Sequence, residues 1–128
     1  MRERADVSLS ELQIALMRVL WRRGEASTAD VAAELSGERG LKHTTVATLL
    51  TRLEKRGVVA QRREGRQLLY RALVAESDVR RSMVAGLVGA LFAGDARQLV
   101  AHLLQESEIA PGDLAELKRR LARERRDE

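Results

Sequence analysis

The chain has 128 residues, of which 45% are hydrophobic and 33% charged, a length and composition that favour one small globular domain with or without an appendage and exclude a disordered chain. It has no cysteine and only two histidines, which excludes disulfides and thiolate chemistry, and we expect neither a metal site nor a cofactor. The formal net charge is +4, and the excess is concentrated between residues 41 and 71, where 8 basic side chains are accompanied by only 2 acidic ones.

The N-terminal part predicts two helices. The first six residues include four charged side chains and no apolar core follows them, so they do not resemble a secretory signal, and we expect a cytoplasmic protein. The first helix is predicted from Ser10 to Gly24, because Ser10 and Gln13 have the spacing of a capping box and Gly24 can end a helix. A second helix is predicted to begin at Ser27, and residues 36–40 are predicted to form a turn.

The next segment predicts one more helix and a hairpin. The helix is predicted from His43 to Arg56, with a stop at Gly57. Two short runs of strand-forming residues follow, 58–63 and 67–72, and a glycine in their connection indicates a hairpin. We therefore predict a mostly α-helical protein with a small β-hairpin wing, in the chain order of a winged helix-turn-helix domain. The alternative is a small α+β domain that does not bind DNA.

The two faces of this third helix differ in chemistry. The residues predicted to face the core are Val46, Leu49, Leu50 and Leu53. The side chains of the opposite face are small and hydroxylated near the start of the helix and cationic towards its end, which suits a helix that enters the major groove. Small side chains let the backbone approach, and hydroxyls bind base edges or phosphates. Arginine binds guanine through two hydrogen bonds. The residues expected to contact DNA are Lys42, His43, Thr44, Thr45, Thr48, Arg52 and Lys55. At each of them an exposed position without function is the alternative.

Arginines surround the predicted hairpin tip. Arg62, Arg63 and Arg66 can lie along phosphates or reach the minor groove, although surface arginines also keep an exposed strand soluble. Beside a basic helix they favour a polyanionic partner. The chain has one Trp, one Tyr and one Phe, too few aromatic rings to stack the bases of a single strand, so we expect double-stranded DNA.

The remainder of the chain is predicted to be helical. Ser77 and Asp95 are placed to cap two successive helices, and Pro111, the only proline, suits the first turn of a third. Residues 123–128 are predicted to be a frayed tail. The longest uncharged apolar stretch, 82–94, is too short to cross a membrane, so we expect no membrane insertion.

Residues 7–73 are thus predicted to form the winged-helix domain, and 74–122 a C-terminal helical dimerisation region. Residues 83–93 are apolar on every side, and a helix of that kind needs burial all round, which a region of about 50 residues cannot supply alone. A second copy can supply it, and two-fold symmetry then requires a pseudo-palindromic site on DNA. The residues expected at the dimer interface are Met83, Val84, Leu87, Val88, Leu91, Phe92, Leu99, Leu103, Leu114, Leu117 and Leu121.

Motifs of enzymes are absent from the sequence. There is no glycine-rich phosphate loop, no nucleophile elbow and no His-Glu-x-x-His sequence. Glu106 and Glu108 are predicted on a polar loop with no sign of a cleft. We therefore expect a binding protein and not an enzyme.

Several short strings of residues, together with Leu9 and Leu99, form a recognisable pattern in this chain. They are Leu16-Met17-x-x-Leu20-Trp21, Thr45-Val46-x-Thr48-x-Leu50-x-Arg52-Leu53-x-x-x-Gly57, Phe92-x-Gly94 and Leu114-x-x-Leu117. Over residues 9–121 this pattern resembles the penicillinase repressor (BlaI/MecI-type) family. The resemblance implies a homodimeric transcriptional repressor whose winged-helix domains bind a palindromic operator and whose C-terminal helices interlock.

The resemblance also implies how repression ends. In that family a β-lactam-sensing membrane metalloprotease is linked to cleavage within the C-terminal region, so a sensor of this kind, or another protease, is an expected partner. The family's Asn-Phe cleavage point corresponds here to His102-Leu103, and its usual serine before the last helix is replaced by Ala110-Pro111. Copper-responsive relatives carry a C-terminal cysteine cluster, which this chain lacks.

Two other functions remain open at this point. A winged-helix repressor that senses a small molecule would bind it in the dimer region, and a thermal shift on adding the ligand would favour that function. A winged-helix protein-interaction module would not bind DNA at all, and an absence of salt-dependent duplex binding would favour it.

Overall fold

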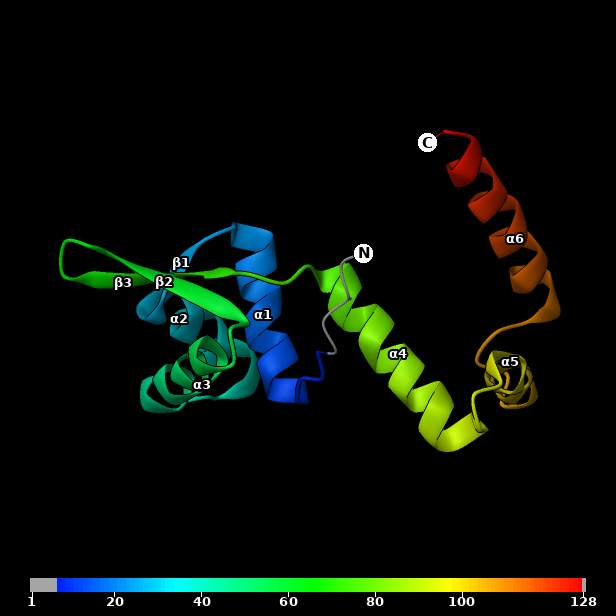
Figure 1. Cartoon of the computed structure of the whole chain (residues 1–128), viewed down its shortest axis with the longest axis horizontal. Helices are drawn as coiled ribbons and strands as arrows, with labels where there is room; N and C mark the ends of the chain where they lie inside the picture. The colour runs from blue at the N-terminus through cyan, green and yellow to red at the C-terminus, as the bar shows by residue number, and fades with distance from the viewer. Residues whose placement is uncertain (1–6, 128) are drawn as a thin grey trace. The chain divides into compact units, whose positions relative to one another are not determined.

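The computed structural model describes residues 7–127, which form two compact units divided between Met83 and Val84 (Figure 1). The helices and strands are α1 (Glu11–Arg23), β1 (Ala26–Ser27), α2 (Thr28–Arg39), α3 (His43–Lys55), β2 (Val59–Glu64), β3 (Gln67–Ala72), α4 (Glu76–Phe92), α5 (Ala96–Gln105) and α6 (Pro111–Arg126). The charged N-terminal residues 1–6, from which no secretory signal is predicted, lie outside the described residues.

The predicted capping boxes of the first two helices are confirmed. The Gln13 N–H donates to Ser10 Oγ at 3.1 Å, and the Ser10 N–H donates to the Gln13 side chain at 3.0 Å. The same reciprocal pair joins Ser27 and Asp30 at the start of α2. Each box satisfies two backbone donors that a helix start leaves free, so both helix starts are determined locally.

The turn predicted at 36–40 is wrong. The α2 helix continues to Arg39 and ends at Gly40, where φ is +65° and the backbone N–H donates to Ser36 O. Gly37 therefore lies inside the exposed last turn of the helix, where a glycine costs only about 1 kcal/mol relative to alanine and does not by itself end the helix. Only Gly40 adopts the left-handed conformation that ends the helix.

The three strands form an antiparallel sheet in the order β1-β3-β2. The predicted hairpin of β2 and β3 is confirmed, whereas the two-residue β1 was not predicted. Ser27 of β1, Leu69 of β3 and Arg62 of β2 make the last row in which all three strands pair. Beyond this row the hairpin continues as a two-stranded ribbon, and Figure 1 shows its turn projecting past α2 and α3. We call this two-stranded part, residues 63–68, the wing tip.

The core of the N-terminal unit lies between its helices and the sheet. Its largest fully buried side chains are Leu16, Met17, Leu20, Val31, Leu35, Val46, Leu50, Leu53 and Val59. Trp21 packs against this core, and its Nε1–H donates to Val74 O at 2.9 Å. Val79 of α4 is 3% exposed in the same core, and Met83 packs against it. The unit therefore extends past residue 73, and Met83, expected at a dimer interface, is partly buried within its own chain.

The C-terminal helices differ in two places from the prediction. Ser77 does not cap α4, because the helix begins at Glu76 and the N–H groups of Asp78 and Val79 donate to Ala75 O instead. The α6 helix runs to Arg126, so residues 123–126 are helical and not frayed; arginines are good helix formers and favour the negative end of the helix dipole. The predicted cap at Asp95 and the predicted place of Pro111 in the first turn of α6 are confirmed.

Between residues 7 and 127 no single helix is long and apolar enough to cross a membrane. The α4 and α5 helices reach the required length and composition only as a pair, and they are bent by 80° at the break between them.

We expect Leu20→Ala to lower the free energy of unfolding of the N-terminal unit by about 2–5 kcal/mol, because the residue is fully buried and its truncation leaves a cavity. Leu12→Ala is the matched control in the same helix: Leu12 is 36% exposed, so we expect a loss of about 1 kcal/mol or less. Urea unfolding followed by circular dichroism measures both. Equal losses would contradict the assignment of the core.

Candidate nucleic-acid interface

The orientation of α3 is determined by its apolar stripe. Val46, Leu50 and Leu53 have no exposed surface, and Leu49 packs partly buried beside them. The predicted core-facing side of the helix is therefore confirmed. Because these residues occupy one side, the residues between them in the helical spacing are directed to solvent.

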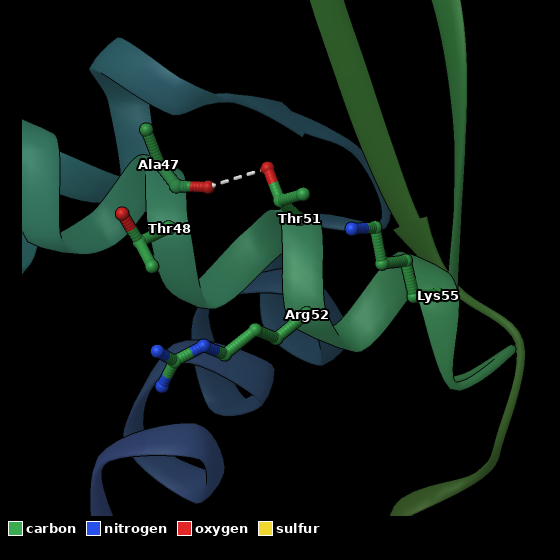
Figure 2. Close-up of a pocket in the computed structure, with 5 residues that line it drawn as sticks. All are labelled: Ala47, Thr48, Thr51, Arg52 and Lys55. Carbon is green, nitrogen blue, oxygen red and sulfur yellow. Dashed lines mark hydrogen bonds between the residues drawn. The ribbon is translucent and has the colours of Figure 1, made fainter.

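The solvent-facing side of α3 carries a shallow groove of about 320 Å³. It is lined by Ala47, Thr48, Thr51, Arg52 and Lys55 (Figure 2). Figure 2 shows the Arg52 guanidinium and the Lys55 amine extending from the helix on different sides of the threonines. The groove thus combines a small, methyl-bearing floor with two cationic side chains. Among its residues, Thr51 and Ala47 were not singled out by the sequence as DNA contacts.

The threonine hydroxyls of the groove are hydrogen-bonded within the helix. Thr48 Oγ1 donates to Thr44 O at 3.0 Å, and Thr51 Oγ1 donates to Ala47 O at 2.9 Å. Each hydroxyl has a single proton, so in this conformation it offers an approaching ligand only acceptor lone pairs and the side-chain methyl. The hydrogen-bond donors on this face are therefore the arginine and the lysine.

The start of α3 is open to an anion. Lys42 occupies the N-cap without a side-chain hydrogen bond to the helix, and the first turn contains no acidic residue. Lys42, His43, Thr44 and Thr45 are all exposed. The free backbone N–H groups and the helix dipole favour a negative group at this end, and the lysine adds a full positive charge.

The cations of this surface fall into two groups: those in no ion pair, and Arg62, which is paired with carboxylates. In the described part of the chain, Lys42, Arg52 and Lys55 are in no ion pair, and the same holds for Arg63 and Arg66 of the wing tip. Their positive charge is therefore available to a ligand.

Arg62 differs from these cations because carboxylates surround it. Its Nε–H and Nη2–H donate to the two oxygens of Glu25 at 2.8 and 2.7 Å, and Nη2 also donates to Glu64 at 2.9 Å. The hydrogen bonds and charge of Arg62, together with the charge of Arg71, hold the pKa of Glu25 below its usual value. The Glu25 hydrogen bonds raise the pKa of Arg62. The sequence did not reveal this cluster, since Glu25 and Arg62 are far apart along the chain.

In the C-terminal unit, half of the residues predicted to dimerise are exposed and the other half are only partly buried. No residue of α5 or α6 is buried. The exposed members of the predicted set are Val84, Leu87, Leu91, Leu117 and Leu121, and the partly buried ones beyond residue 84 are Val88, Phe92, Leu99, Leu103 and Leu114. Within the described residues there is no group of three or more acidic or histidine side chains that could hold a metal ion.

The predicted cleavage pair lies inside α5. His102 is exposed and its ring is 6.0 Å from that of Phe92, whereas Leu103 is partly buried. The helix ends two residues further on, at Gln105.

Comparisons with known proteins agree on one family. The family model described as penicillinase repressor matches residues 9–123. The methicillin resistance regulatory protein MecI of Mammaliicoccus sciuri is 24% identical over 113 residues, which cover 88% of this chain and 90% of that protein. The penicillinase repressor of Bacillus licheniformis is 26% identical over 109 residues, which cover 85% of each.

Solved structures agree with this result. The solution structure of the DNA-binding domain of the repressor BlaI is 31% identical with a TM-score of 0.51, and the match covers 61% of this chain and 93% of that one. The structure of monomeric Bacillus licheniformis BlaI with the blaP half-operator is also 31% identical with a TM-score of 0.51, and the match covers 58% of this chain and 90% of that one. The fold of the N-terminal unit is thus a winged helix. Because the family model extends from the segment before α1 into α6, the chain belongs to the penicillinase repressor family of winged-helix transcriptional repressors.

Proposed function

We propose that this protein represses transcription by binding a pseudo-palindromic operator as a homodimer, with α3 in the major groove and the wing tip along the phosphate backbone. The observation that carries the proposal is the solvent face of α3, where unpaired cations flank a groove with a floor of small side chains. The BlaI structure with a half-operator supports it, because that protein shares 31% of its residues over the matched region.

The α3 surface is suited to base contacts at its centre. Ala47 and the threonine methyls allow the helix backbone to approach base edges, and methyl groups also fit against the methyl of thymine. Arg52 is exposed and has no carboxylate partner within residues 7–127, so its two parallel N–H groups are available for guanine O6 and N7. Lys42 and Lys55, at the two ends of the helix, are placed for phosphates.

Arg52→Ala is expected to weaken operator binding by about 1–3 kcal/mol and to relax the preference at one base pair of each half-site, as the loss of a bidentate base contact does. Arg66→Ala is expected to weaken binding to all duplexes alike and to make the dependence of log K on log salt shallower by about one unit. Fluorescence anisotropy with the selected operator and a scrambled duplex, at several salt concentrations, measures both effects.

Arg22→Ala is the control, because Arg22 is already paired with Glu34 on the α1–α2 side of the unit. It should leave the base-pair preference unchanged and alter the slope of log K against log salt by no more than a few tenths. Equal affinity of the wild-type protein and Arg52→Ala at every salt concentration would exclude α3 as the reading helix.

The exposed apolar side chains of the C-terminal unit are the argument for the proposed dimer. Leu91 is 71% exposed and Leu121 is 56% exposed, so the single chain leaves large leucine side chains in water. Gly86 and Gly89 have open space where a Cβ would lie, which permits a second helix to approach α4 closely. A symmetric partner would cover these surfaces and place two reading helices about one or two DNA turns apart, in steps of about 10 bp.

Leu87→Asp is expected to shift the protein from dimer to monomer at micromolar concentration, because it places a carboxylate in the apolar interface. Leu73→Asp is the matched control: Leu73 is 49% exposed but precedes α4. Sedimentation equilibrium measures the state of each variant, and far-ultraviolet circular dichroism checks that each is folded. A wild-type protein that sediments as a monomer would contradict the dimer.

Loss of the C-terminal helices is the proposed route to derepression. A dimer binds its second half-site as an intramolecular event at high effective concentration, so an event that separates the two copies releases DNA without changing α3. Proteolysis between His102 and Leu103 would remove α6 together with the end of α5. A sensor protease is the proposed partner, on the strength of the family alone.

A chain truncated after His102 is expected to bind the operator at least 100-fold more weakly than the full chain, since avidity contributes about 10²–10⁴. The isolated half-site duplex should be bound equally by both proteins, because the N-terminal unit is intact. A truncated chain that dimerises and holds the operator as tightly as the full protein would exclude cleavage there as the switch.

A further inference from the structure

Arg62 lies at the point where the sheet narrows from three paired strands to two. Its row, with Leu69 and Ser27, is the last in which three strands pair, and the wing tip beyond it has only two (Figure 1). Two-stranded ribbons are marginally stable and twist more than wider sheets, so a change in the direction of the wing tip would pivot at this row, which we call the hinge.

The Arg62 side chain spans the sheet at this hinge. Glu25 precedes β1 on one edge of the sheet, Arg62 belongs to β2 on the other, and β3 lies between them. The contact is bidentate, at 2.8 and 2.7 Å, and the Glu25 side chain is only 30% exposed. A planar two-point contact determines orientation as well as distance, which a single exposed ion pair does not.

The charges at the hinge cancel. Arg62 donates to both Glu25 and Glu64, and Arg71 adds a positive charge near Glu25, so two cations and two carboxylates are grouped together. Arg63 and Arg66, by contrast, are in no ion pair among residues 7–127. The positive charge that the wing offers to a polyanion is therefore concentrated in its tip.

We propose that Glu25 and Arg62 form a clasp that sets the direction of the wing tip relative to α3, and that Arg62 is a positioning residue and not a phosphate contact. The clasp acts through Arg63 and Arg66: it holds their guanidinium groups where the phosphates beside the α3 site pass. This inference rests on the proposed DNA binding for its consequence, but the clasp itself can be tested without DNA.

The test compares Glu25→Gln with Glu64→Gln in the full-length protein. Each variant removes one carboxylate charge that lies beside Arg62. Only Glu25 connects the two edges of the sheet, so Glu64→Gln is the matched control. Without DNA, we expect backbone amides of the wing tip to exchange hydrogen about tenfold faster in Glu25→Gln, with α1 amides and the melting temperature unchanged. Glu64→Gln should exchange like the wild type.

The DNA readout uses the duplex that the wild-type protein selects from a random pool. Glu25→Gln is expected to bind it about three- to tenfold more weakly, with an equal or shallower salt slope, the size expected for one well-formed exposed ion pair. Glu64→Gln should bind equally or slightly better, because it adds net positive charge. The reversed pair, Glu25→Arg with Arg62→Glu, should restore slow exchange at the wing tip.

Two results would overturn the clasp. One is equal wing-tip exchange in Glu25→Gln and the wild type. The other is tighter binding by Glu25→Gln with a salt slope steeper by about 0.9, which would show that Arg62, once released, neutralises a phosphate. A wild-type protein that selects no duplex would refute the proposed function, and the exchange measurement would still decide the clasp.

Discussion

Burial of the apolar stripe of α3 determines what the N-terminal unit can present to a ligand. With Val46, Leu50 and Leu53 fully buried against the other helices and the sheet, α3 cannot rotate about its axis. Its groove, with Arg52 and Lys55, must then lie on the surface. Val58 and Val59, which lead into β2, are buried in the same core, so the hairpin leaves the core at a defined point. The chemistry of the exposed face thus depends on hydrophobic contacts that no ligand touches.

The surface cations are not equivalent, although a count of basic residues gives each of them the same weight. Arg52, Arg63 and Arg66 differ from Arg62 because only Arg62 has carboxylates within hydrogen-bonding distance. An arginine that already forms a bidentate carboxylate pair would have to break it before it could bind phosphate, and Coulomb attraction to a second anion is weakened by the first. Position in the fold therefore divides arginines of one short segment into those that can bind a polyanion and one that holds the segment in place.

The two units differ in how they satisfy their apolar residues. In the N-terminal unit, helices and strands cover one another and the large side chains are fully buried. In the C-terminal unit, leucines of α4 and α6 remain exposed even though the helix starts are well formed, with a cap at Asp95 and a proline at the start of α6. Helix formation is thus a local property here, whereas burial requires more surface than 45 residues provide.

The sequence by itself determined the features that depend on near neighbours. The capping boxes at Ser10 and Ser27, the α3 stripe and the hairpin all follow from residues within a few positions of each other, and so does the exposed basic face of α3. The resemblance to a repressor family likewise rests on short strings of residues. The turn predicted at 36–40 is wrong because the glycine that ends α2 is Gly40, which adopts the left-handed conformation, and not Gly37, which the exposed last turn of the helix includes at a modest cost.

Only the tertiary structure decided the contacts between distant segments. The pairing of β1 with β3, the partial burial of Met83 beside the winged-helix core and the contact of Arg62 with Glu25 join residues far apart in the chain. A two-residue strand has no periodicity to detect, and a charged residue has the same sequence signature whether it is free or paired. Which partners meet depends on loop closure and on the summed packing of the whole unit, and these are properties of the fold and not of any window of its sequence.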